Sequence, residues 1–195
     1  MKFSDKEKKD LFFAGLMISL AFAVLLSGGL GVLSSGFYIV FIIAFFTAGI
    51  GFLFHELMHK YVAQGYGLFA EFRAYYKMLW LAILLSFFGF IIAAPGAVYI
   101  KGNINKEKNG KISVAGPVTN LILGVLFLVL LLALRPEGIL GEFLSFGLTI
   151  NSLLAAFNML PVVPFDGSKV IAWNKKVYTI TLIMGIGLFI LSWLV

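Results

Sequence analysis

The sequence predicts an all-α polytopic membrane protein with about five or six transmembrane helices and a small re-entrant or β-hairpin element at the cytoplasmic face. Composition is the first reason, because 61% of the 195 residues are hydrophobic and only 12% are charged, unlike a typical soluble domain. The second reason is the recurrence of long apolar runs, since about 20 apolar residues cross a bilayer as a helix. The third is the placement of Lys and Arg, which are enriched in the cytoplasmic loops of membrane proteins.

Five apolar runs are candidate transmembrane helices. They cover residues 11–33, 37 to about 63, 112–134, 139 to about 160, and 177–195. Four lysines precede the first run, and its 23 residues exceed the apolar core of a signal peptide, so we interpret it as a retained span. No polar stretch is long enough for a second soluble domain, and we therefore expect a single integral membrane domain over residues 1–195.

A further apolar segment, residues 78–94, is interpreted as an element that enters the membrane and returns, or that lies at its surface. Its 17 residues could just cross a bilayer. However, Arg73 and Lys77 precede it and a lysine-rich loop, residues 101–111, follows it. Both flanks are therefore expected in the cytoplasm, whereas a full crossing would place four lysines outside.

Two short segments beside this element are expected to form strands. Residues 69–75 and 97–101 alternate in polarity and contain aromatic or β-branched side chains. Backbone of this kind at a membrane must be paired or must face protein and water. We therefore expect a small sheet at the inner face.

The charge pattern also predicts how the chain is oriented. With five crossings the N-terminus lies in the cytoplasm, and Arg135 is the only one of the 15 Lys and Arg residues outside. This orientation predicts a multi-pass protein of the cell membrane. The net charge of +6 is carried by short loops beside apolar runs rather than by a basic groove with aromatic residues, which argues against a nucleic-acid partner.

The segment HELMH, residues 55–59, contains both histidines of the chain. On a helix, side chains four residues apart lie on one face, so His55 and His59 point to the same place. Neutral imidazoles in this arrangement bind zinc, which lowers the pKa of a bound water. Glu56 is then the expected general base, which takes the proton of the zinc-bound water and passes it to the leaving amine. The alternative is a pair of histidines that only form hydrogen bonds inside a helix bundle.

A catalytic zinc site needs a third protein ligand. Because the chain has no further His and no Cys, a carboxylate is expected. Asp166 is the favoured candidate, since with five crossings it lies near the inner face at the depth of the two histidines. Glu71 is the second candidate. Alternatively, Asp166 caps the N-terminus of the helix that follows it.

Three segments together resemble the site-2 protease family of intramembrane zinc metalloproteases. They are HELMH (55–59), AGPVTN (115–120) and NMLPVVPFDG (158–167). The resemblance implies one zinc ion per chain, bound by the two histidines and Asp166, with Glu56 as the base. It also implies that Asn158 contacts the substrate or the developing oxyanion, although an intramembrane Asn equally often forms a hydrogen bond between helices.

The second of these segments is interpreted more simply. Asn120 and the Gly116–Pro117 pair are expected to shape the start of the third core helix, because Pro fits the first turn of a helix.

The resemblance implies hydrolysis of a peptide bond in or near a transmembrane helix of a substrate, as in regulated intramembrane proteolysis. The expected partners are a transmembrane protein substrate, the lipid bilayer and regulatory proteins acting in trans, and the active-site mouth is expected to face the cytoplasm. The alternative is a membrane metal carrier or sensor with the same ligands. A carrier usually lines a continuous polar path, but the outer halves of the spans contain few polar residues besides Asn151 and Glu142. A carrier also has no use for Glu56 as a base.

Overall fold

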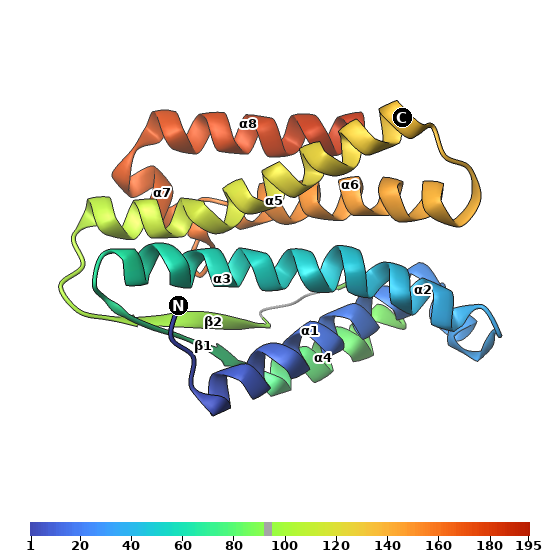
Figure 1. The fold of residues 1–195 in the computed structure, drawn as a ribbon, viewed down its shortest axis with the longest axis horizontal. Helices are drawn as coiled ribbons and strands as arrows, with labels where there is room; N and C mark the ends of the chain where they lie inside the picture. Colours follow the sequence, from blue (N-terminus) through green and yellow to red (C-terminus); the bar gives the residue numbers. More distant parts are fainter. Residues whose placement is uncertain (92–94) are drawn as a thin grey trace. The chain divides into compact units, whose positions relative to one another are not determined.

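The computed structural model describes residues 1–91 and 95–195, and Figure 1 shows its helices and strands. This part of the chain contains eight α-helices: α1 (Asp5–Leu26), α2 (Phe37–Ala44), α3 (Ile50–Gly65), α4 (Tyr76–Ser86), α5 (Lys106–Leu134), α6 (Gly138–Asn158), α7 (Asp166–Trp173) and α8 (Lys175–Leu191). A 3-10 turn, Leu30–Leu33, precedes α2, and a π-helical turn, Phe45–Gly49, joins α2 to α3. The strands are β1 (Phe69–Ala74) and β2 (Gly96–Lys101).

Four helical segments of the described residues are long and apolar enough to cross a membrane: Asp5–Leu26, Phe37–Gly65, Lys106–Leu134 and Gly138–Asn158. They confirm the prediction of an all-α polytopic membrane protein. The fifth predicted crossing, residues 177–195, corresponds to α8, which has 17 residues. At 1.5 Å per residue α8 spans roughly 26 Å, the lower limit for a transmembrane helix.

The apolar segment 78–94 contains the short helix α4. Its 11 residues correspond to roughly 16 Å, about half of the hydrocarbon thickness of a bilayer. This length agrees with a re-entrant or interfacial element, because such a helix cannot cross by itself. The end of the predicted segment, residues 92–94, lies outside the described residues.

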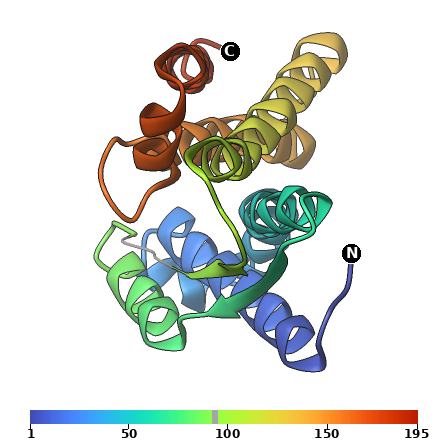
Figure 2. The same cartoon turned by 90° about the vertical axis from the view of Figure 1, so that its left-hand side faces the viewer.

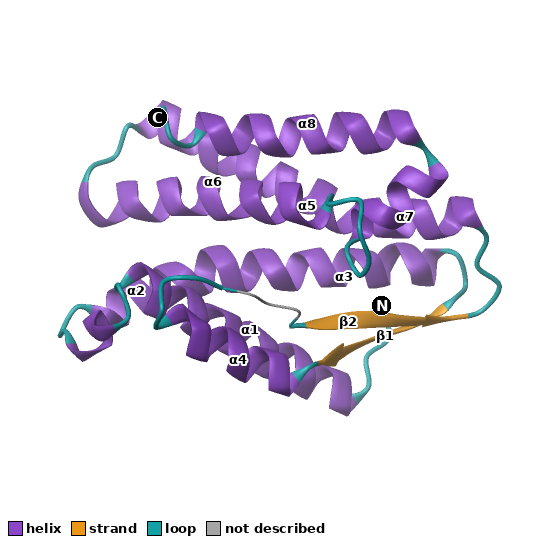
Figure 3. Ribbon diagram, turned by 180° about the vertical axis from the view of Figure 1, so that it is seen from behind, coloured by secondary structure: helices purple, strands orange, loops and turns teal. Residues whose placement is uncertain are grey.

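The two predicted strands are confirmed. Segments 69–75 and 97–101 coincide with β1 and β2, which pair as a two-stranded sheet, drawn in orange in Figure 3. Their location at the inner face of a membrane stays a prediction.

The chain divides into two compact units. Unit 1 contains Met1–Leu53 and Glu71–Tyr99, and unit 2 contains Phe54–Ala70 and Ile100–Val195. Helix α3 and both strands continue from one unit to the other along the chain. That residues 1–195 act as a single metalloprotease domain stays a prediction.

Unit 1 is built around α1 and α4, which pack together and lie side by side in Figures 1 and 3. Its core contains buried side chains from α1, α3, β1 and α4: Ala14, Ile18, Phe52, Phe72 and Leu79. Each helix buries apolar side chains on the face that contacts this core and exposes large apolar side chains on its opposite face. Exposed apolar side chains are expected where a helix contacts lipid.

Helix α1 begins six residues before the predicted apolar run 11–33. Ser4 explains the early start, because its side chain caps the helix by accepting a hydrogen bond from the Glu7 N–H at 3.1 Å. The helix ends before Gly28 and Gly29, whose positive φ angles of 64° and 73° suit glycine. As a result, the first helix includes acidic residues that the hydropathy pattern places outside it.

Unit 2 consists of α5 to α8 together with most of α3. Helices α5 and α6 are antiparallel, and Figure 2 views the bundle from one end. Small residues allow close packing: a Cβ at Gly147 would lie 2.5 Å from the Phe127 ring, and one at Gly185 would lie 3.0 Å from the Ala156 backbone. Helices α7 and α8 pack around a core of Met159, Val170 and Tyr178.

Candidate metal centre

Unit 2 brings together the three predicted metal ligands. His55 and His59 lie one turn apart on α3, with ring centroids 4.7 Å apart, and Asp166 is the first residue of α7. The Oδ2 atom of Asp166 lies 3.3 Å from the Nε2 atom of His55 and 3.0 Å from the Nε2 atom of His59. All three residues are buried, and their ligand atoms lie within 4.8 Å of one another.

The Nδ1 atom of each imidazole, which points away from Asp166, forms a hydrogen bond. These bonds indicate which ring nitrogen carries the hydrogen. His59 Nδ1 lies 2.8 Å from the Ile112 main-chain oxygen, and His55 Nδ1 lies 2.6 Å from the Asn120 Oδ1 atom. Both oxygens can only accept, so both Nδ1 atoms carry a hydrogen. The Nε2 atom of each ring is therefore the one that can offer a lone pair to a metal.

The geometry of these atoms fits zinc. Three atoms with lone pairs face one another, an arrangement that needs a positive charge, either a proton or a metal ion. Two ligands that each lie about 2.0 Å from a tetrahedral zinc ion are about 3.3 Å apart, close to the observed 3.0 and 3.3 Å. A Cβ atom at Gly116 would lie 2.5 Å from both Nε2 atoms, so glycine leaves the space that the ion needs.

The two imidazoles favour the charged form of the Asp166 carboxylate. Burial alone would raise its pKa, but the adjacent imidazoles of His59 and His55 outweigh burial and hold the pKa well below its ordinary value. Its other oxygen, Oδ1, lies 3.3 Å from the Lys169 Nζ atom. An anionic third ligand suits a dication, because it offsets part of the metal charge in a buried site.

Glu56 follows His55 on α3 and is partly buried. Its carboxyl group interacts electrostatically with His55, Asp166 and Lys169. Glu56 thus lies near the three candidate ligands, but its carboxyl group is not one of them. This is the placement expected of a proton acceptor beside a metal.

Known proteins of similar sequence decide the family. The chain is 42% identical, over 98% of its own length and 98% of the relative's, to "Putative zinc metalloprotease MJ0611" of Methanocaldococcus jannaschii. The chain belongs to the zinc metalloprotease family. It is also 30% identical to "Zinc metalloprotease MJ0392" of the same organism, over 73% of the chain and 37% of that protein.

A bacterial relative agrees with this family: the chain is 31% identical to "Putative zinc metalloprotease YwhC" of Bacillus subtilis, over 64% of the chain and 65% of that protein. No family model and no solved structure matches the chain. Together with the two histidines and Asp166, these relatives identify zinc as the cofactor of this metalloprotease.

Neither of the two alternatives to Asp166 as the third ligand is observed. Glu71, the second candidate, is in unit 1, where its carboxylate accepts from the Arg73 guanidinium at 2.7 Å and from the Ser4 hydroxyl. Asp166 does not cap α7 from outside, because Phe165 occupies the cap position and the helix has no side-chain cap bond. Of the described residues, only Asp166 joins the two histidines.

Asn158 lies at the last residue of α6 and is half-buried. Its amide nitrogen donates to the Leu154 carbonyl of the same helix at 2.9 Å. This bond is neither of the two predicted contacts, so a role towards substrate or oxyanion stays a prediction.

The expectation for the segment AGPVTN was wrong. Gly116 and Pro117 do not start the third core helix but lie well inside α5, which begins at Lys106. The true start was not predicted because the residues before the apolar run are polar: Lys106 to Lys111 form almost two helical turns, which Asn105 caps. Asn120 was missed as a partner of His55. A usable signal exists, since a zinc-binding histidine needs a hydrogen-bond acceptor on its second nitrogen and Asn is rare inside a span.

Proposed function

We propose that this zinc metalloprotease is an intramembrane enzyme of the site-2 type, which hydrolyses a peptide bond in or near a transmembrane helix of its substrate. The observation that carries the proposal is the position of the metal-binding histidines. His55 and His59 lie within the apolar segment Phe37–Gly65, which is long enough to cross a membrane. Polar and ionisable residues inside such a segment are costly and are usually functional.

The residues around the site divide the chemistry between them. His55, His59 and Asp166 hold the zinc, which when bound supplies a Lewis acid that acidifies water and polarises a carbonyl. Glu56 takes a proton from the attacking water as its oxygen bonds to the carbonyl carbon, and passes this proton to the amine nitrogen as the C–N bond breaks. In this scheme Asn158 contacts the substrate or the oxyanion.

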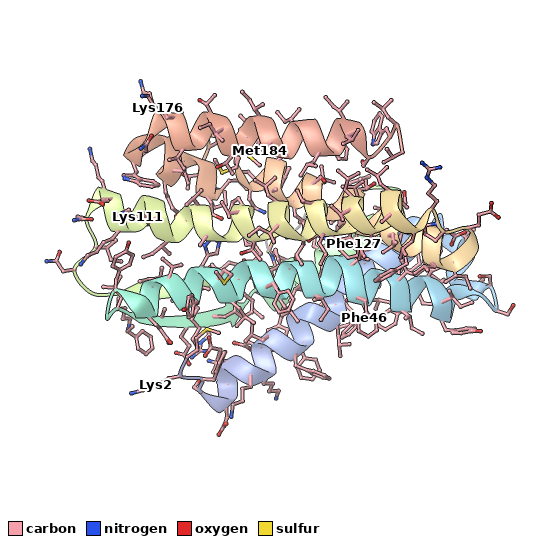
Figure 4. The ribbon with its side chains drawn as sticks, turned by 45° about the horizontal axis from the view of Figure 1, so that its top comes forward. Lys2, Phe46, Lys111, Phe127, Lys176 and Met184 are labelled. Atoms are coloured by element: carbon pink, nitrogen blue, oxygen red, sulfur yellow. The ribbon has the colours of Figure 1, made fainter. Side chains whose placement is uncertain are left out.

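The charged ends of unit 2 support the proposed orientation. Lys111 of α5 and Lys176 of α8 lie at the same end of the unit (Figure 4), whereas Arg135 lies at the turn between α5 and α6. The positive-inside rule then assigns the lysine-rich end to the cytoplasm. We propose a multi-pass protein of the cell membrane whose N-terminus and active-site mouth face the cytoplasm, with a transmembrane protein as substrate and regulators acting in trans.

The test is cleavage of candidate membrane protein substrates by the reconstituted enzyme and by Glu56→Gln, with zinc content measured in parallel. We expect the variant to retain its zinc, because Glu56 is not a ligand, and to lose cleavage by at least about 100-fold. Cleavage that persists in Glu56→Gln would refute this mechanism. Zinc transport without cleavage by the unmodified protein would instead support a metal carrier.

A further inference from the structure

We infer that two buried amides, Asn120 and Asn151, form a hydrogen-bond relay of fixed polarity that determines which nitrogen of His55 carries its hydrogen. The relay runs from a main-chain carbonyl of α6 through α6 and α5 to the imidazole on α3, entirely within unit 2. Both amides are therefore positioning residues, which act on zinc binding through His55. The inference depends on the zinc site and not on the substrate that we propose.

The polarity of the relay begins at Gly147. Its carbonyl oxygen can only accept, and it lies 2.9 Å from the Asn151 side-chain nitrogen. The Asn151 amide is therefore oriented with its nitrogen towards Gly147 and its oxygen towards α5. A flipped amide would place two oxygens against each other in a fully buried position.

The orientation of Asn151 determines the orientation of the Asn120 amide on α5. The Asn151 Oδ1 atom lies 3.0 Å from the Asn120 Nδ2 atom, so Asn120 is the donor in this contact. Its own oxygen then faces the other way, where it lies 2.6 Å from the His55 Nδ1 atom. Because this oxygen accepts, Nδ1 is the protonated nitrogen and Nε2 keeps its lone pair.

The opposite orientation would disable one ligand. If Asn120 were flipped, its NH₂ group would face His55 and favour the tautomer in which Nε2 carries the hydrogen. A protonated Nε2 cannot bind zinc. Both amides are fully buried, so water cannot correct the orientation, and the hydrogen bonds that begin at Gly147 favour the tautomer that binds zinc.

His59 reaches the same tautomer by a shorter route. Its Nδ1 atom donates directly to the Ile112 main-chain oxygen at 2.8 Å, a group that no substitution removes. The two ligands on α3 therefore differ in an observable way, because only His55 depends on replaceable side chains. Substitutions in the relay should weaken zinc binding without any contact to the metal.

The experiment measures the zinc affinity of the full-length protein in detergent, by competition with a chelator. Asn151→Leu removes the oxygen to which the Asn120 amide donates, and we expect zinc binding to weaken about 10- to 100-fold. Ser152→Ala is the matched control, because Ser152 is equally buried on α6 but its hydroxyl bonds only to the Leu148 carbonyl of the same helix at 2.6 Å. We expect the control to bind zinc as the unmodified protein does.

A double substitution separates orientation from packing damage. In Asn120→Asp both side-chain oxygens are acceptors, so either one suits His55. The second oxygen then faces the Asn151 Oδ1 atom, an unfavourable contact that Asn151→Leu removes. Adding Asn151→Leu to Asn120→Asp should then weaken zinc binding by no more than about threefold. If Asn151→Leu weakened zinc binding as much in the Asn120→Asp protein as in the unmodified protein, the inference would be overturned. Unchanged zinc affinity in Asn151→Leu alone would also overturn it.

A milder variant covers the case in which Asn151→Leu does not fold. Asn151→Ser keeps a hydroxyl that can bond to Gly147, as Ser152 bonds to Leu148, but is too short to reach Asn120. We expect the same loss of zinc affinity as for Asn151→Leu, with thermal unfolding of the metal-free protein close to that of Ser152→Ala. Full zinc affinity in the folded Asn151→Ser protein would also overturn the relay.

Discussion

Buried carboxylates occur in both units, but they face different kinds of atoms. In unit 1, Asp10 accepts a hydrogen bond from the Tyr76 hydroxyl at 2.8 Å and lies 3.9 Å from the Arg73 guanidinium. In unit 2, Asp166 faces the Nε2 atoms of His55 and His59, whose other ring nitrogens already donate to oxygens.

This difference shows why burial of charge alone does not identify a metal site. Asp10 is surrounded by groups that bring their own hydrogens or positive charge, so its environment is complete without an ion. Asp166 shares its space with atoms that have lone pairs and needs a cation to hold them together. The chemistry of the neighbouring atoms therefore separates a structural carboxylate from a ligand, and three substitutions test this distinction.

The largest effect is expected for Asp166→Asn. This change keeps the shape of the side chain but removes its charge, so the zinc loses its only anionic ligand. We expect zinc affinity to fall by more than the roughly 100-fold that marks the loss of a residue supporting a ligand. Metal analysis of the purified protein measures this, and full zinc occupancy at low free zinc would show that Asp166 is not a ligand.

A smaller effect is expected for Gly116→Ala. The added Cβ would lie 2.5 Å from the Nε2 atoms of both histidines, so the imidazoles must move apart. Overpacking of this kind costs about 1–3 kcal/mol, which corresponds to roughly 5- to 150-fold weaker zinc binding. The control is Gly124→Ala on the same helix, where the nearest atom is the Ser152 Oγ at 3.3 Å. Equal zinc affinity in both variants would contradict the close approach at Gly116.

The smallest effect is expected for Asp10→Asn, which matches Asp166→Asn in unit 1. The amide oxygen still accepts from Tyr76, and Arg73 keeps its bond to Glu71 at 2.7 Å. We expect unchanged zinc content and a free energy of unfolding lower by about 1–3 kcal/mol, because Asp10 is buried and its charge faces Arg73. Thermal unfolding and metal analysis of the same sample check both statements, and loss of zinc would remove the contrast between the units.

Features that repeat within a few residues were predictable from the sequence. The apolar runs gave the transmembrane helices, alternation gave β1 and β2, and the four-residue spacing of His55 and His59 gave one face of a helix. These predictions succeed because hydrophobic periodicity and helix geometry act locally. The starts of two helices were predicted too late, because polar residues begin α1 at Asp5 and α5 at Lys106, ahead of the apolar runs.

Contacts between distant segments were decided by the tertiary structure. The sequence proposed Asp166 as a ligand, but only the packing of α7 places its carboxylate 3.0 Å from His59. Asn120 and Asn151 are ordinary intramembrane amides in the sequence, and their order in the relay follows from how α3, α5 and α6 meet. A hydrogen bond joins atoms of matching polarity at one distance, and helix packing alone determines which side chains meet at that distance. The sequence thus determined the membrane class, the elements and the histidine pair, whereas tertiary packing decided which acid lies beside the two histidines and which amides form hydrogen bonds behind His55.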